Sequence, residues 1–306
     1  MLGSSRVLNF RSGFLDQNPD MFYNAGASGQ RLREIEAFVD ALTPETAPDV
    51  LMIGLDQFWF NAAWDDQREP APMNTTDIDF DRMMRATRRV LQDLARQNIT
   101  LHQLMNPVSP VYGVRAIGMD AILKGSGYLI DGSRQTNVVQ QSADRQQRPR
   151  NEDITALRNG QGHFTRGDTV SEEAMAQITR ILDKAAALDI EVIGFTLPFM
   201  PTIYNAMQHD GVHSYLDKAV PQLQTLHEER GFMFFDFGDV SAFSQDTELT
   251  DGVHASELLS LKLYMRMVEG APDLLGAYSD LAALQALVDQ APNPHEVIPR
   301  EKKSFF

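Results

Sequence analysis

The stretch Asp49-Val-Leu-Met-Ile-Gly54 decides the fold class of this chain, because four apolar residues follow one another without a polar break. A strand with apolar side chains on both faces is typical of a parallel sheet that helices cover on either side. A second run, Ile190-Glu-Val-Ile-Gly-Phe-Thr-Leu197, has the same character and is stopped by Pro198 and Pro201. The run Phe232-Met-Phe-Phe-Asp236 predicts a third buried strand.

Helical patterns alternate with these strands. Apolar residues recur at helical spacing from Leu32 to Leu42, and acidic residues open a second helix directly after Ser171. Two more helices are predicted, from Tyr215 to Arg230 with an interruption at Pro221, and from Ser256 to Val268. The alternation predicts an α/β fold, a three-layer α/β/α sandwich with a mainly parallel, flavodoxin-like sheet.

Most of the chain is predicted to form one domain, residues 1–270, which carries an insertion at about 98–168. This connection is far longer than the usual one between elements of a compact domain. Its part from Ser133 to Glu152 is rich in Gln, Arg and Asn, so we predict a mobile surface loop there. Residues 271–306 form a predicted helical and irregular C-terminal tail, with a helix from Asp280 to Gln290.

The composition narrows the classes of function. A chain of 306 residues with 43% hydrophobic residues is long enough to bury a sizeable core. Its net charge of −15 argues against binding to nucleic acid or to anionic lipid, which both need Lys and Arg. The absence of cysteine excludes disulfides and thiolate chemistry. The sequence contains neither a visible signal peptide nor an apolar run long enough for a membrane span.

Three short motifs lie where strands are predicted to end: Gly3-Ser-Ser-Arg6, Asn24-Ala-Gly-Ala-Ser-Gly29 after a short strand from Met21, and Asp251-Gly-Val-His254. Together they supply a hydroxyl nucleophile, backbone N–H groups for an oxyanion, and an acid–base pair. Serine attack on an ester needs these parts: a serine that loses its proton to a histidine, and an acid that orients the imidazole. The sequence therefore indicates acyl transfer through Ser5.

The order and spacing of these motifs resemble the SGNH/GDSL hydrolase family, from Gly3 to His254. The resemblance implies the SGNH hydrolase fold, a catalytic triad of Ser5, Asp251 and His254, and an oxyanion site at Gly29, with neither metal nor cofactor. The family's usual Asp before the nucleophile is Ser4 here.

The third block of the family departs from its pattern in this chain. The family has Gly-x-Asn-Asp, in which the Asn side chain donates to the oxyanion, whereas this chain has Gly54-Leu-Asp56-Gln57. An ionised Asp56 cannot donate a hydrogen bond, but the amide of Gln57 lies one residue further along. We expect Asn24 to shape the turn of the second block beside the oxyanion site. Phe58 and the two aromatic residues after it are expected in the core or in a wall beside the acyl group.

The resemblance implies a serine ester hydrolase or O-acyltransferase acting on an acylated carbohydrate or another cell-envelope polymer. Related variants include membrane-associated proteins such as those of teichoic-acid D-alanylation, which implies a location outside the cytoplasm. The serine motif begins after only Met1 and Leu2, although a buried strand is expected before it. A complete gene is therefore expected to encode an upstream strand, preceded by an export signal or membrane anchor. The alternative function is a catalytically degenerate relative that binds glycan or a partner protein.

The tetrapeptide of the last motif occurs twice, as Asp210-Gly-Val-His213 and as Asp251-Gly-Val-His254. The second copy follows the last predicted strand, where the carboxyl ends of the sheet gather functional loops, so we assign the catalytic role to it. His209 and His213 also have the four-residue spacing of two metal ligands on a helix. Gly211 between them weakens such a helix and no third ligand is apparent, so a zinc site is the weaker hypothesis.

Overall fold

The computed structural model describes residues 1–26, 29, 31–64, 80–97, 100–102, 126–136 and 143–298. The chain divides into two compact units, and the larger consists of Met1–Asp66, Asp131–Ser133 and Val138–Pro299. The smaller unit contains helix α2 (Phe80–Ala95) and an antiparallel pair, β2 (Gly127–Tyr128) with β3 (Arg134–Gln135). All the residues of the site described below belong to the larger unit.

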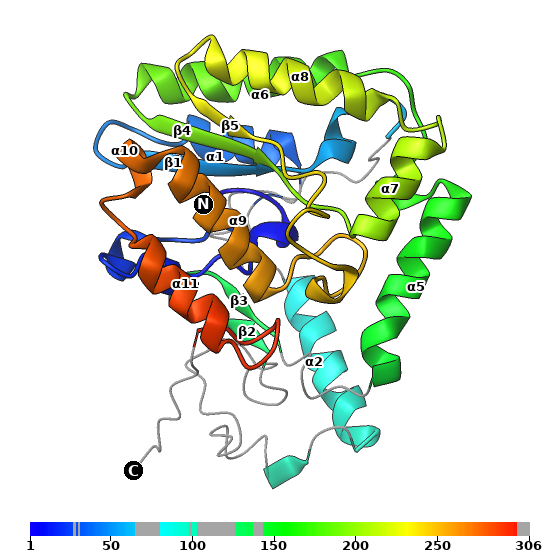
Figure 1. The fold of residues 1–306 in the computed structure, drawn as a ribbon. Helices are drawn as coiled ribbons and strands as arrows, with labels where there is room; N and C mark the ends of the chain where they lie inside the picture. Colours follow the sequence, from blue (N-terminus) through cyan, green and yellow to red (C-terminus); the bar gives the residue numbers. More distant parts are fainter. Residues whose placement is uncertain are drawn as a thin grey trace. The chain divides into compact units, whose positions relative to one another are not determined.

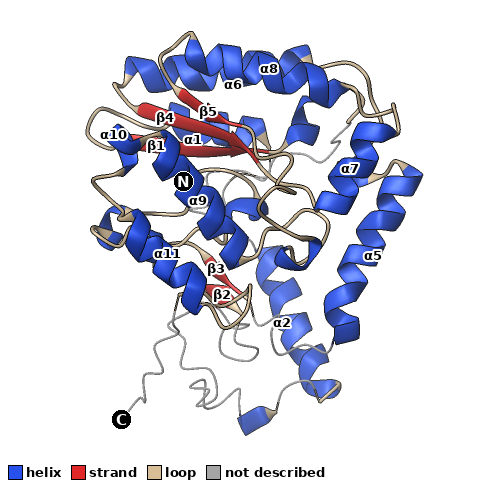
Figure 2. Cartoon of the chain, viewed as in Figure 1, coloured by secondary structure: helices blue, strands red, loops and turns tan. Residues whose placement is uncertain are grey.

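The larger unit is built on a small parallel sheet of the order β1-β4-β5 (Figures 1 and 2). Its strands are β1 (Val50–Leu55), β4 (Glu191–Thr196) and β5 (Met233–Phe235). The first two coincide with the apolar runs of the sequence, and the prediction of a parallel sheet is confirmed for these three strands. On the outer edge of β1, Leu2 adds a single parallel bridge to Ile53, with its N–H 2.8 Å from the Met52 carbonyl oxygen.

The helices of the larger unit lie before, between and after these strands in the chain. They are α1 (Leu32–Asp40), α5 (Ala143–Asn159), α6 (Glu172–Ala187), α7 (Pro201–His209), α8 (Tyr215–Glu228), α9 (Glu257–Gly270), α10 (Pro272–Leu275) and α11 (Leu281–Gln290). Helix α6 contacts α1, α8 and β4, whereas α10 and α11 both pack on α9. Ser171 and Ser256 cap α6 and α9, each accepting a hydrogen bond from the backbone N–H three residues on.

Strand β4 shows how the core is packed on its two sides. Gly194 faces α8 so closely that an added Cβ would lie 2.1 Å from Nε2 of His227, so only glycine fits there. The next residue, Phe195, packs its ring against Phe10, with 5.6 Å between ring centroids. Phe10 in turn contacts Phe14, which stacks on Tyr264 of α9. The segment after the serine motif therefore joins α9 to the sheet.

Three local predictions were wrong. The strand expected from Met21 is absent: Pro19–Met21 forms a 3₁₀ turn, and Met21 is 64% exposed, so no burial favours an extended strand. The loop expected at 133–152 is helical from Ala143 onward, where α5 begins; residues 137–142 lie outside the described part. Pro221 lies inside α8 without interrupting it, because the helix is held by packing on β5 and α6.

Within the described part of the chain, no helix combines the length and apolar character that spanning a membrane requires.

Candidate active site

The turn that carries Ser5 is shaped by its neighbours. Gly3 has φ +149°, and an added Cβ would lie 2.8 Å from Val7 Cγ1 and 3.0 Å from the Gly54 carbonyl oxygen, so the chain can pass β1 only as glycine. Ser4 Oγ then accepts a hydrogen bond from the Arg6 N–H at 3.2 Å and caps the 3₁₀ turn Ser5–Val7. Ser5 itself is exposed, beside the carboxyl end of β1.

The loop Asp251–His254 is folded around the carboxylate of Asp251. Oδ1 accepts hydrogen bonds from the backbone N–H groups of Val253, at 2.9 Å, and His254, at 2.7 Å. A hydrogen bond from Thr250 N–H to the His254 carbonyl oxygen, at 2.9 Å, closes the loop just before α9 begins. The carboxylate thus fixes the backbone that carries the imidazole.

The structure brings the three residues of the expected triad together. His254 Nε2 lies 2.9 Å from Ser5 Oγ, and His254 Nδ1 lies 2.7 Å from Asp251 Oδ2. A carboxylate can only accept, so Nδ1 carries the proton towards Asp251, and a neutral ring then leaves Nε2 free to accept from the Ser5 hydroxyl. This tautomer suits a base that removes the serine proton.

Asp251 is held in its charged form. Burial raises its pKa, but the hydrogen bond and charge of His254 together with the two backbone N–H groups outweigh burial and lower the pKa to about 2. The acid is therefore ionised throughout the neutral range. It can orient the imidazole and stabilise the imidazolium that forms when Ser5 loses its proton.

Arg6, directly after Ser5, ties the segments of the site together. Its Nη1 lies 2.5 Å from Asp56 Oδ1, and its Nη2 and Nε donate to the carbonyl oxygens of Pro198, at 2.5 Å, and Val253, at 2.8 Å. The guanidinium also lies over the ring of Phe199, 5.0 Å from its centroid. The serine turn, the end of β1, the end of β4 and the histidine loop all meet at this one buried side chain.

The third block does not present a side-chain donor in the way expected of Gln57. Asp56 is fully buried in its ion pair with Arg6, so its role is to anchor the serine turn. The amide nitrogen of Gln57, also buried, donates to the Leu197 carbonyl oxygen at 2.7 Å. Sequence reasoning had no means of finding these partners, because they are 50 and 140 residues away from the two side chains.

Residues of the second block contact the serine turn. Asn24 is buried and donates from Nδ2 to the carbonyl oxygens of Val7, at 2.8 Å, and Phe10, at 3.0 Å, while its Oδ1 accepts from Gly26 N–H. Gly29 lies beside the same turn, since an added Cβ there would be 3.1 Å from the Gly3 carbonyl oxygen. Asn24 is thus committed to the turn, and both described glycines of this block adjoin the serine turn, since an added Cβ at Gly26 would be 3.2 Å from the Ser4 carbonyl oxygen.

The duplicate tetrapeptide makes similar local hydrogen bonds, but its imidazole faces a backbone carbonyl in place of a serine hydroxyl. His213 Nδ1 lies 2.8 Å from Asp210 Oδ2, and Asp210 Oδ1 accepts from Val212 N–H at 2.9 Å. Its Nε2, however, faces the Phe164 carbonyl oxygen at 3.1 Å, and the imidazole is fully buried. Both ring nitrogens of His213 are therefore engaged within the protein. Among the described residues, no group of three or more His, Cys, Asp and Glu side chains is arranged to hold a metal ion.

His163 is a residue near the site that sequence reasoning missed. Its ring stacks on Phe58 with 4.5 Å between centroids and 12° between planes. Burial, the largest cause, lowers its pKa, and the charges of the Arg6–Asp56 pair and of the Asp251–His254 pair act on it as well. Phe58 and the next two aromatic residues are buried, as in a core, while Phe58 also contacts the half-buried Trp64. No motif surrounds His163, so only the fold could reveal it.

Comparison with protein-family models, with curated proteins and with solved structures found no match for this chain.

Proposed function

We propose that this chain is a serine ester hydrolase or O-acyltransferase of SGNH type, with the three-layer α/β/α arrangement of that fold. The observation that carries the proposal is the continuous chain of contacts from exposed Ser5 Oγ through His254 to ionised Asp251, at 2.9 and 2.7 Å. Two features besides the contacts support it: His254 has the geometry of the basic tautomer, and Ser5 is accessible to a substrate.

In the acylation step, Ser5 Oγ bonds to the carbonyl carbon of the ester while His254 Nε2 takes the hydroxyl proton. The carbonyl electron pair moves to its oxygen, and the backbone N–H groups of Ser5 and Gly29 are the proposed donors to that oxyanion. When the bond to the alcohol breaks, His254 returns the proton to the leaving oxygen. The acyl group is then held as an ester on Ser5.

In the second step, His254 removes a proton from water or from a hydroxyl of an acceptor as its oxygen attacks the acyl-serine. Breakdown of the second tetrahedral intermediate returns the proton to Ser5 and releases an acid or a new ester. The proposed substrate is an acylated carbohydrate or another cell-envelope polymer, and the proposed location is outside the cytoplasm. Both follow from the family resemblance of the sequence motifs.

A fluorophosphonate probe that reacts with activated serines tests the proposal. The wild-type protein is expected to be labelled and to hydrolyse a small aryl acetate, and Ser5→Ala should lose both properties. Ser241→Ala, which removes another exposed hydroxyl, is the matched control and should keep both. Undiminished labelling and hydrolysis in a folded Ser5→Ala protein would overturn the assignment, and an unreactive wild type would favour the binding-module alternative.

A further inference from the structure

Helix α5 holds the catalytic loop from outside the sheet. Arg150 donates from Nε and Nη2 to the Leu249 carbonyl oxygen, at 3.0 and 2.5 Å, and from Nη2 to the Thr247 carbonyl oxygen at 3.3 Å. One turn further along, Asp153 Oδ2 accepts a hydrogen bond from the Gly252 N–H at 2.8 Å. Two side chains of one helix therefore bind the backbone immediately before and within the loop that carries Asp251 and His254.

The contact at Gly252 is close enough to require glycine. An added Cβ would lie 2.7 Å from Asp153 Cβ and 2.9 Å from its Oδ2. Gly252 is flanked by Asp251 and Val253, whose backbone N–H already donates to Asp251. Asp153 is thus a second carboxylate that binds the loop. It accepts from the Gly252 N–H, whereas Asp251 accepts from the N–H groups of Val253 and His254, so the two carboxylates together fix the loop backbone.

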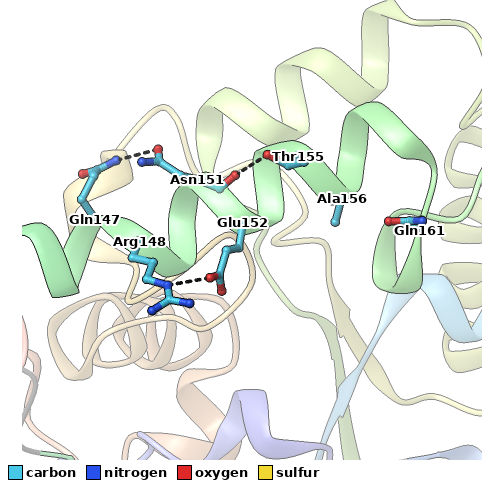
Figure 3. Close-up of a pocket in the computed structure, with 7 residues that line it drawn as sticks. All are labelled: Gln147, Arg148, Asn151, Glu152, Thr155, Ala156 and Gln161. Carbon is cyan, nitrogen blue, oxygen red and sulfur yellow. Dashed lines mark hydrogen bonds and ion pairs between the residues drawn. The ribbon is translucent and has the colours of Figure 1, made fainter.

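The face of α5 that meets the loop is distinct from its outer face. Figure 3 shows the outer face, where polar side chains line a surface pocket and interact with one another along the helix. Arg148 and Glu152 form an exposed ion pair there at 2.8 Å. Asp153 and Arg150 lie on the opposite side of the helix. Successive residues of an α-helix are 100° apart around its axis, so positions 150 and 153 point away from positions 148 and 152.

We propose that Asp153 is a positioning residue for the acyl-transfer reaction, which holds the Gly252 N–H and favours the protonated form of His254 through its negative charge. This inference rests on the proposed function and deepens it. The hydrogen bond fixes the loop before substrate binds. The charge acts when His254 takes the proton of Ser5, because an imidazolium is stabilised by a second nearby carboxylate as well as by Asp251.

The charged groups around Asp153 support this coupling. Burial raises its pKa most, the Gly252 N–H opposes that effect, and the charge of Asp251 raises the pKa while that of His254 lowers it. Glu152 on the same helix raises it further. Arg150, the cation nearest in sequence, is committed to carbonyl oxygens of the loop. A positive charge on His254 therefore stabilises the Asp153 carboxylate, although less than the Gly252 N–H does, and by reciprocity the carboxylate stabilises that charge.

Two variants separate the contribution of the Asp153 hydrogen bond from that of its charge. Asp153→Asn keeps an oxygen that can accept from Gly252 and loses only the charge, whereas Asp153→Ala loses both. Without the charge the imidazolium of His254 is less stable, so the acid limb of the kcat/KM profile should shift to lower pH in both variants. The Ala variant should also show kcat lowered roughly tenfold, the factor that about 1.4 kcal/mol of barrier produces, and Asn should restore most of that loss.

The experiment measures pH profiles of aryl acetate hydrolysis for wild type, Asp153→Asn, Asp153→Ala, and Glu229→Gln. The last removes an exposed acid at the end of α8, which does not act on Asp153, and should leave the acid limb where it is. A wild-type acid limb in Asp153→Asn overturns the inference, even where Asp153→Ala fails to fold. If Ser5→Ala loses activity while the Asp153 variants keep the pH profile of the wild type, only this inference is refuted. Activity in Ser5→Ala would refute the proposed function instead.

Discussion

Nη1 of Arg6 lies 2.5 Å from Oδ1 of Asp56, and the two side chains are only 2% and 1% exposed. Arg6 directly follows Ser5 in the chain, and Asp56 directly follows Leu55, the last residue of β1. The remaining N–H groups of Arg6 hold Pro198 and Val253, so the ion pair joins four segments from distant parts of the chain. The pair therefore helps to join the serine turn to the histidine loop, together with Asn9 Nδ2, which donates to the Ala255 carbonyl oxygen at 2.6 Å.

Removing one partner of this pair should destabilise the protein strongly. We expect Asp56→Asn to lower the free energy of unfolding by about 3–5 kcal/mol, because Arg6 is left as an uncompensated buried charge. Urea denaturation gives the difference. The matched control is Glu36→Gln, which breaks the exposed pair with Arg180 and should cost at most about 1 kcal/mol. Equal effects of the two variants would show that burial does not govern the strength of the Arg6–Asp56 pair.

The two copies of the Asp-Gly-Val-His tetrapeptide should separate catalysis from stability. His254→Gln is expected to lower turnover of a model ester by roughly 10⁴–10⁶-fold with little change in stability, because it removes the general base. His213→Gln is expected to keep turnover and to lower the free energy of unfolding by about 1–3 kcal/mol, because it disrupts buried bonds to Asp210 and Phe164. Rates and urea unfolding of both variants are the measurements. The catalytic role would belong to the other copy if the two results were exchanged.

The ionisation of Asp251 should appear in the pH dependence of stability. Its pKa falls from 3.8 to about 2 on folding, so the folded state binds its proton less readily than the unfolded state. The ionised form therefore contributes about 2 kcal/mol of stability above pH 4, and this contribution is lost as the pH falls towards 2. Asp251→Asn should lack this part of the acid-induced loss, which urea unfolding at pH 2 to 6 would reveal. Identical slopes for wild type and variant would contradict the lowered pKa.

Gln57 should matter for stability and not for turnover. Its amide nitrogen donates to the Leu197 carbonyl oxygen at 2.7 Å, so Gln57→Leu is expected to cost about 1–3 kcal/mol through the unpaired carbonyl. The rate per folded molecule should stay near the wild-type value. Thermal unfolding and active-site titration with the fluorophosphonate probe give the two quantities. A loss of about 100-fold or more in rate would place Gln57 among the oxyanion donors.

Much of the local structure follows from the sequence because its causes are local. The apolar runs at Asp49 and Ile190 form β1 and β4, and Ser171 and Ser256 start helices, since capping and apolar periodicity depend on neighbouring residues. Helix α5 could not be predicted in this way. Its sequence is polar and contains Pro149, and its side chains Arg150 and Asp153 bind a loop about 99 residues away.

The residues of the candidate site could be predicted from the sequence only where they lie within short motifs. The residues Ser5, Asp251 and His254 were expected together, and the structure places them within hydrogen-bonding distance. The partners of Asp56 and Gln57 were not expected, because a buried polar group takes whichever partner the packing places beside it.

The two copies of the tetrapeptide separate what the sequence alone determines from what only the tertiary structure determines. In both copies the sequence alone determines that the aspartate binds the backbone N–H two residues on and the histidine Nδ1 three residues on, because these bonds span a single turn. What each Nε2 meets is decided only by the fold: the Phe164 carbonyl oxygen for His213, and Ser5 for His254. The second contact joins residues 249 positions apart, and only the packing of strands and helices around the Arg6–Asp56 pair closes that distance.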